Sequence, residues 1–279
     1  SIDMDQLISL CWPHNNKMEK MPKFAANLMY LFTELPFEAR FKAAADAGFR
    51  DVEYQFPYGK DLDLMRDALV VNRLNMVLIN APAGDADRGE RGIAALAGRE
   101  ADFRDSFLDA LAHARELRCP RVHVMSGVVA EKDTALAIAV YAENLRFAAR
   151  TAESAEINVV VEPINGIDVP GYLIQRTEQA RALIAMVGEE NLNLQYDVYH
   201  ALMNGEDPIE GLRANFDTIR HIQVAGYPGR HEPIGDGYDM RGFFEACDIM
   251  GYAGVIGCEY KPATTTKAGL GWASVYGIS

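Results

Sequence analysis

The sequence contains few cysteines and no excess of positive charge. Its four cysteines, Cys11, Cys119, Cys247 and Cys258, show no CxxC spacing among 279 residues, so neither a disulfide framework nor a zinc ribbon is expected. We predict that they are reduced thiols in a cytoplasmic protein. Because 27 Lys and Arg face 40 Asp and Glu, the net charge is −13, which disfavours a nucleic-acid partner and suits a small substrate or a cation.

Long apolar runs are also missing. A membrane span needs about 18 to 20 uninterrupted apolar residues, and charges interrupt the longest apolar stretches, so no membrane partner is expected. The N-terminus lacks the order of a secretory signal, and residues 1–20 have no clear periodicity. We expect 1–20 to be an irregular extension, natural or added, and 21–279 to form one domain, since an apolar fraction of 49% can fill a full-sized core.

From residue 23 onward, short β-rich runs alternate with segments of helical period. This alternation is typical of βα units on a parallel sheet. No G-x-G-x-x-G follows a strand and no G-x-x-x-x-G-K-[ST] occurs, which disfavours dinucleotide and P-loop chemistry. Eight units in about 250 residues predict an α/β fold, the (β/α)₈ TIM barrel. The predicted strands cover residues 24–30, 51–56, 75–80, 121–125, 158–163, 193–198, 221–225 and 255–260.

Local signals predict where several helices begin and end. Thr33 can cap a helix that Gly48 terminates, with Pro36 in its first turn. Asp207 followed by proline marks a second helix start, and Thr177 marks a third. Each signal predicts a separate helix between two strands.

Polar side chains end four consecutive apolar runs in the second half of the chain. They are Glu162, Asp197, Gln223 and Glu259, each about one βα repeat from the next. Barrel enzymes place catalytic groups at the carboxyl ends of strands, so the four side chains should converge at the barrel mouth. Oxygen donors of this kind suit Mg²⁺ or Mn²⁺ better than Zn²⁺. A single strand-end carboxylate is usually a loop cap or ion-pair partner, but several together repel one another unless a cation or shared protons relieve them.

Seven segments spread over residues 21–272 carry a resemblance to a known family. They are PKFAANL at 22–28, GRE at 98–100, VEPIN at 161–165, QYDVYH at 195–200, HIQVA at 221–225, PGRHEP at 228–233 and GCEYKP at 257–262. With these segments the sequence resembles the hydroxypyruvate isomerase family, part of the xylose isomerase-like TIM-barrel superfamily.

The resemblance implies an isomerase that needs few cofactors. Two glutamates that match Glu162 and Glu259 would act as proton donor and acceptor. Both, together with the residues matching Asp197 and Gln223, would also bind the metal. Related ketose 3-epimerases usually have histidine at the position of Gln223, so the glutamine favours the hydroxypyruvate isomerase branch.

The chemistry of such a reaction can be stated from first principles. Moving a carbonyl along a two-carbon unit requires a proton to leave the hydroxyl-bearing carbon and another to reach the former carbonyl carbon, through an enediolate. Two carboxyl groups with tuned pKa values can exchange these roles. A divalent cation on both substrate oxygens would stabilise the enediolate charge. For hydroxypyruvate the product is tartronate semialdehyde.

Four further residues are candidates for binding a small anionic hydroxy or keto acid. His200 could hydrogen-bond a substrate oxygen, with loop packing as the alternative. Arg230 and Lys261 could meet the substrate carboxylate, since arginine binds carboxylates in bidentate fashion, or they could be solvated loop charges. Arg91 could belong to a lid loop that closes over the substrate.

Two other polar residues fall within predicted strands. His123 is expected to pack structurally inside its strand. Glu53 follows Val52 and is expected to point into the barrel, where it can support the site.

Four rival functions stay open at this point. The nearest is a 2-oxo-tetronate isomerase of the same family, followed by a ketose 3-epimerase. A metal-dependent endonuclease on the same barrel would need a His-rich, multi-zinc site, which six histidines and a charge of −13 disfavour. A non-catalytic binding barrel is the last alternative, and whether the protein is a homo-oligomer also stays open.

Overall fold

Eight parallel strands close into one barrel. The computed structural model describes residues 22–235 and 237–279, so the predictions for residues 1–20 and for Cys11 lie outside the described residues. Each strand pairs with the next in chain order, and β8 pairs with β1, which confirms the predicted TIM barrel. The strands are β1 (Lys23–Asn27), β2 (Asp51–Glu53), β3 (Asn75–Asn80), β4 (Arg121–His123), β5 (Asn158–Val161), β6 (Leu192–Asp197), β7 (Ile219–Val224) and β8 (Val255–Cys258).

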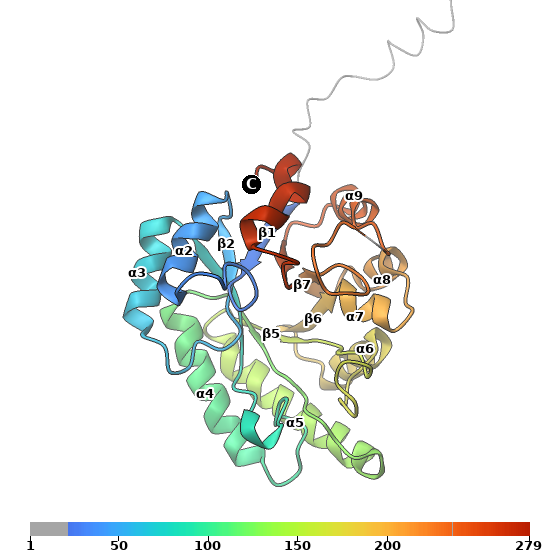
Figure 1. The fold of residues 1–279 in the computed structure, drawn as a ribbon. Coiled ribbons are helices and arrows are strands. Elements are labelled where there is room, and N and C mark those ends of the chain that lie inside the picture. Colours follow the sequence, from blue (N-terminus) through green and yellow to red (C-terminus); the bar gives the residue numbers. More distant parts are fainter. Residues whose placement is uncertain (1–21, 236) are drawn as a thin grey trace, which may run out of the picture.

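Helices surround the strands on all sides (Figure 1). The α-helices are α2 (Phe37–Asp46), α3 (Leu62–Asn72), α4 (Glu100–Glu116), α5 (Thr134–Glu153), α6 (Thr177–Val187), α7 (Val198–Met203), α8 (Pro208–Asn215), α9 (Arg241–Met250) and α10 (Thr266–Gly269). Short 3₁₀ turns are η1 (Ala86–Arg88), η2 (Glu131–Asp133) and η3 (Leu270–Tyr276). Because the helices cover the outer face of the barrel, the strands carry apolar residues on both faces.

All eight predicted strands exist, but most end earlier than predicted. β1 stops at Asn27 rather than at residue 30, and β8 stops at Cys258 rather than at residue 260. After Asn27 the chain turns out of the barrel, and the Asn27 Oδ1 accepts a hydrogen bond from the Met29 amide at 3.0 Å. The residues predicted as strand ends therefore form the loops around the barrel mouth.

Two helix starts differ from the prediction, and two signals are confirmed. Thr33 does not cap α2, which begins after Pro36; the extended backbone of Pro36 and the restriction that proline places on the residue before it prevent an earlier start. Thr177 is the first residue of α6 rather than its cap. Asp207 caps α8 by accepting from two amides, and Gly48 follows α2 with a φ of 103°, as a terminating glycine should.

The strands of the barrel are deeply buried. Val159, Val160 and Val161 of β5 have no solvent exposure. The described cysteines, Cys119, Cys247 and Cys258, are free and buried, in agreement with the predicted thiols. No described helix has both the length and the apolar character that a membrane crossing requires. The cytoplasmic location stays a prediction.

Candidate active site

The four predicted strand-end residues lie at the carboxyl ends of β5 to β8. Glu162 directly follows β5, Asp197 ends β6, Gln223 lies in β7 and Glu259 directly follows β8. Asp197 and Gln223 pair in the sheet register, whereas Gln223 pairs with Gly257, two residues before Glu259. Glu259 therefore lies higher in the barrel than Gln223. All four side chains are at least nine-tenths buried.

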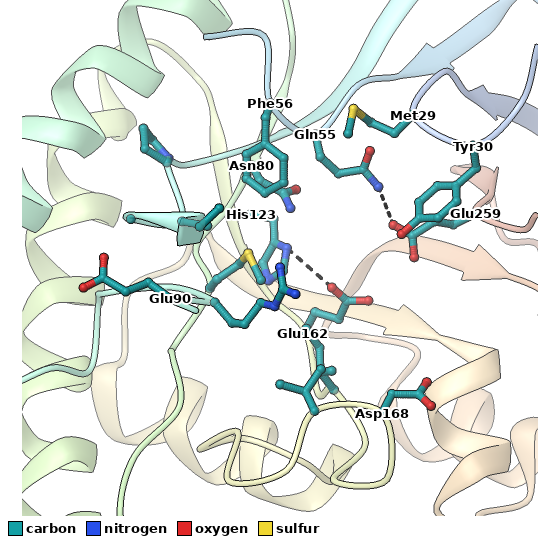
Figure 2. A pocket seen from close by; sticks show the side chains of 18 of the residues that line it. Met29, Tyr30, Gln55, Phe56, Asn80, Glu90, His123, Glu162, Asp168 and Glu259 are labelled. Atoms are coloured by element: carbon teal, nitrogen blue, oxygen red, sulfur yellow. Dashed lines mark hydrogen bonds and ion pairs between the residues drawn. The ribbon is translucent and has the colours of Figure 1, made fainter. Parts of the chain in front are cut away.

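A cavity of about 460 Å³ opens at this end of the barrel. Glu162 and Glu259 both line it, and Figure 2 shows the two carboxylates facing the same space from different strands. His200, Arg230 and Arg91 line it as well. Two carboxyl groups that line one cavity can approach one small substrate from different sides.

Glu162, Asp197 and His200 form a tight cluster. One potential ligand atom from each lies within 4.8 Å of the other two. The His200 Nε2 is 3.7 Å from the Asp197 Oδ2 and 3.9 Å from the Glu162 Oε1. Asp197 also uses its other oxygen to cap α7, accepting from the Tyr199 amide at 2.8 Å, which fixes the carboxylate orientation.

The hydrogen bonds around His200 assign its tautomer. The Asn165 Oδ1 accepts from the amides of Ile167 and Asp168 at 3.0 and 2.9 Å, so its Nδ2 must face His200. That Nδ2 lies 2.7 Å from the His200 Nδ1, which must accept. The proton of the neutral ring is therefore on Nε2, toward the carboxylates. In this tautomer His200 is a hydrogen-bond donor to the cavity rather than a metal ligand.

Gln223 belongs to a second polar layer beneath the carboxylates. Its Nε2 donates to the Glu53 Oε2 at 2.8 Å, and its Oε1 accepts from Gln195 at 2.6 Å. Glu53 also accepts from Asn27 at 3.0 Å and contacts the His221 Nε2. The layer has almost no solvent exposure. Glu53 thus points into the barrel as expected, and it holds the amide of a predicted metal ligand in a fixed orientation.

Burial and mutual repulsion raise the pKa values of the two glutamates. Burial raises the pKa of Glu162 well above its usual range, and the charges of Glu259 and Asp197 add to this effect. Burial raises the pKa of Glu259 to about 7, although the Arg230 charge opposes the rise. A carboxyl group with a pKa near neutrality, such as that of Glu259, can both donate and accept protons under physiological conditions.

Arg230 is a half-buried cation beside Glu259. It donates to the Glu259 Oε2 at 2.5 Å, and its guanidinium lies 4.9 Å from the ring centre of Tyr199 and 5.6 Å from that of Tyr30. These contacts fix the guanidinium plane and hold it against a glutamate.

The remaining predicted residues are divided between two places. Arg91 lines the cavity from the loop after β3. Lys261 instead lines a separate depression, together with Met29 and Tyr30. Its amide donates to the Arg230 carbonyl oxygen at 2.9 Å. The predicted binding residues His200, Arg230 and Arg91 therefore surround one cavity, and Lys261 does not line it.

His123 was not expected at the site, yet it lines the cavity. It ends β4, and its Nδ1 lies 3.4 Å from the Glu162 Oε2 (Figure 2). Neither ring nitrogen has a hydrogen-bond partner among the described residues. Burial lowers the pKa of His123 to about 3, so the ring is neutral. The rule that strand ends carry site residues would have found it, had the end of β4 been predicted correctly.

The donor set fits a divalent cation. Glu162 and Asp197 are buried carboxylates whose side chains lie together, and in the described residues Glu162 meets only histidine nitrogens at 3.4 and 3.9 Å. Carboxylate oxygens that lack strong donors are suitable ligands for a hard cation. The other two predicted ligands are on the neighbouring strands and already have partners: the Gln223 Oε1 accepts from Gln195, and the two oxygens of Glu259 accept from Gln55 and Arg230. Both side chains would have to exchange these bonds for a cation.

Comparison with known proteins agrees with the fold and gives the family. A family model described as xylose isomerase-like TIM barrel matches residues 41–274. The chain is 45% identical to the 2-oxo-tetronate isomerase of Cupriavidus necator, over 92% of this chain and 99% of that protein. It is 41% identical to the hydroxypyruvate isomerase of Escherichia coli, over 92% of this chain and 100% of that protein.

Solved structures share the fold. A crystal structure described as AP endonuclease, family 2, from Brucella melitensis superposes with a TM-score of 0.90 at 40% identity, covering 92% of this chain and 99% of that one. The 3-keto-D-glucoside 4-epimerase of E. coli shares the fold, with a TM-score of 0.72 at 18% identity, covering 92% of this chain and 100% of that one. The chain therefore belongs to the xylose isomerase-like TIM-barrel family, and it is an isomerase of the group that contains hydroxypyruvate isomerases and 2-oxo-tetronate isomerases.

Proposed function

We propose that the protein interconverts hydroxypyruvate and tartronate semialdehyde through an enediolate, with Glu162 and Glu259 as the acid/base pair. The observation that carries the proposal is the position of two buried carboxyl groups, from the ends of β5 and β8, in one small cavity. Their raised pKa values suit groups that must alternate between proton acceptor and donor. Relatives with the corresponding names support the substrate class.

The reaction needs two carbon-bound protons to be handled by the chain. One carboxylate removes a proton from the hydroxyl-bearing carbon C3, which gives the enediolate, and the other carboxyl group delivers a proton to C2. The hydroxyl proton passes from the C3 oxygen to the C2 oxygen, so the composition is unchanged. The Nε2–H of His200 faces this space and can donate a hydrogen bond to a substrate oxygen. In the reverse direction the two glutamates exchange roles.

A divalent cation, Mg²⁺ or Mn²⁺, is part of the proposal. Glu162 and Asp197 would hold it, with Gln223 and Glu259 from the adjacent strands. When bound, the cation supplies Lewis-acid stabilisation of the enediolate charge. Glu53 contributes by holding the Gln223 amide, and the Tyr199 amide contributes by orienting Asp197.

A 2-oxo-tetronate is the second candidate substrate. It has one more hydroxymethylene group than hydroxypyruvate and can undergo the same shift of a carbonyl between adjacent carbons. The cavity of about 460 Å³ exceeds what a three-carbon acid fills, and a relative at 45% identity carries the name 2-oxo-tetronate isomerase. The cavity therefore has room for either substrate.

Side-by-side kinetics test the proposal. Purified protein is assayed with hydroxypyruvate and with a 2-oxo-tetronate, with Mg²⁺ or Mn²⁺ added and with chelator. We expect Glu162→Gln and Glu259→Gln to lower turnover by about 10²–10⁴-fold. The matched control is Glu153→Gln on the exposed end of α5, which should retain turnover. Full turnover by either active-site variant contradicts the acid/base roles, and cleavage of an abasic-site duplex would instead favour the endonuclease alternative.

A further inference from the structure

The loop after β3 brings an arginine to the cavity. Residues 82–92 connect the end of β3 to the segment before α4, and six of them, Pro82, Ala83, Gly84, Ala86, Glu90 and Arg91, line the cavity. The loop is held closed at its base, where the Gly92 amide donates to the Ala83 carbonyl oxygen at 2.8 Å. A Cβ at Gly92, whose φ is 111°, would overlap the backbone of Met125. This close approach fixes the position of the residue next to Arg91.

Acidic side chains outnumber arginines around the cavity. Glu162, Glu259 and Asp168 line it, and Asp197 lies just behind. An anionic substrate therefore depends on arginine to offset the field of the site.

Of the two arginines that line the cavity, Arg230 already has partners in the protein. Its guanidinium is hydrogen-bonded to Glu259 and packed against two tyrosine rings. Turning toward a substrate would break this ion pair and leave the buried Glu259 with only the Gln55 amide as a partner, at a considerable cost in free energy. Arg230 is thus best suited to holding Glu259 in place.

Arg91 is free to bind. Its side chain is exposed, and among the described residues it has neither hydrogen bond nor ion pair. The adjacent carboxylate does not compete for it, because Glu90 pairs with Arg99 at 2.7 Å and accepts from the Asp85 amide at 2.7 Å. Glu90 lies across the cavity from Glu259 (Figure 2). The loop that carries Arg91 therefore faces the carboxylates that would perform the chemistry.

We infer that Arg91 binds the carboxylate of the substrate and makes the site selective for acids over neutral hydroxy ketones. The inference rests on the proposed function and assigns one end of the substrate to the loop after β3. A guanidinium binds a carboxylate through two parallel hydrogen bonds, so it fixes orientation as well as affinity. With the carboxylate held there, carbons C2 and C3 extend toward Glu162 and Glu259.

The test separates binding from catalysis. Arg91→Ala and Arg91→Lys are compared with Arg88→Ala, which removes an exposed arginine of the same loop that does not line the cavity. The probes are hydroxypyruvate as substrate, D-glycerate as an unreactive acid and D-glyceramide as its neutral counterpart. For Arg91→Ala we expect the KM for hydroxypyruvate and the Kd for glycerate to rise by about 10- to 100-fold, with kcat within about threefold and glyceramide binding unchanged. Arg91→Lys should be intermediate, and Arg88→Ala should behave as wild type.

Two outcomes overturn the inference. One is a KM and a glycerate Kd that stay within twofold in Arg91→Ala, and the other is a wild-type protein that binds glycerate no better than glyceramide. Failure of the proposed function gives a different pattern. The wild-type protein would then turn over neither hydroxypyruvate nor a 2-oxo-tetronate, whereas the glycerate measurements would still report on Arg91. Thermal unfolding of each variant distinguishes loss of binding from loss of fold.

Discussion

The guanidinium of Arg230 donates a hydrogen bond over 2.5 Å to the Oε2 of Glu259, which follows β8. The pair is mostly buried, with side-chain exposures of 21% and 9%. Burial raises the pKa of Glu259 to about 7, and the positive charge of Arg230 keeps it from rising further. The arginine therefore controls the pH at which this carboxyl group can act as a base.

Arg230→Gln should move the acid limb of the activity profile to higher pH. Glu259 accepts a proton only when ionised, and removing the charge that favours ionisation raises its pKa. We expect kcat/KM to fall below its plateau at a higher pH in the variant than in wild type. The measurement is kcat/KM for hydroxypyruvate across the pH range at constant ionic strength. The control is Arg220→Gln, at an exposed position of β7, which should leave the acid limb at its wild-type pH. If the acid limb of Arg230→Gln stayed at the same pH or moved to lower pH, the proposed role of the pair would be contradicted.

Gly257→Ala should destabilise the protein by about 1–3 kcal/mol or more. A Cβ at Gly257 would overlap the carboxylate of Glu53, which cannot move aside because Asn27, Gln223 and His221 all bond to it in a fully buried layer. Chemical denaturation measures the change in the free energy of unfolding.

The matched control for this variant is Gly242→Ala near the start of α9. No atom lies within 4 Å of a Cβ at that position, and alanine is the better helix former. We expect this variant to be as stable as wild type or more so. Equal stability of both alanine variants would show that the Glu53 layer can rearrange, contrary to the structure.

The sequence predicted the barrel and most of the site because both depend on local patterns. The alternation of strand and helix patterns predicts the order of the strands. A residue at the end of a predicted strand is expected at the mouth of the barrel, and this rule located Glu162 and Asp197. His123 was missed because its strand was predicted two residues too long. The tautomer of His200 depends on the amide orientation of Asn165, which is set by loop hydrogen bonds that leave no pattern in the sequence. Side-chain orientations and tautomers of this kind can be assigned only from the structure.

His123 should make the stability of the protein fall as the pH decreases from 6.5 toward 3. Burial lowers its pKa from 6.5 to about 3 in the folded state, so in this window the unfolded chain binds a proton that the folded chain does not. Unfolding is then favoured by up to about 1.4 kcal/mol for each pH unit of acidification. His123→Asn removes this contribution, and its unfolding free energy should depend less steeply on pH.

The comparison of wild type with His123→Asn isolates this one group. The raised pKa of Glu259 acts with the opposite sign between about 4.5 and 7, but it is present in both proteins and cancels in the difference. Urea unfolding in the presence of chelator, at several pH values between 4.5 and 7, gives the two slopes. His231→Asn removes an exposed imidazole and serves as the control. Identical slopes for wild type and His123→Asn would contradict the assignment of a neutral, buried ring.

Metal affinity should depend on Asp197 and much less on His200. The Nε2 of His200 carries the ring proton because Asn165 donates to its Nδ1, so the ring has no free lone pair toward the carboxylates. Asp197 instead presents an ionisable oxygen, and its replacement removes both a ligand and a negative charge. We expect Asp197→Asn to weaken Mn²⁺ binding by at least about tenfold, whereas His200→Gln stays within about threefold. Titration with Mn²⁺, followed by electron paramagnetic resonance, measures both without relying on activity. If His200→Gln weakened Mn²⁺ binding as much as Asp197→Asn does, the histidine would be a ligand and the tautomer assignment would be wrong.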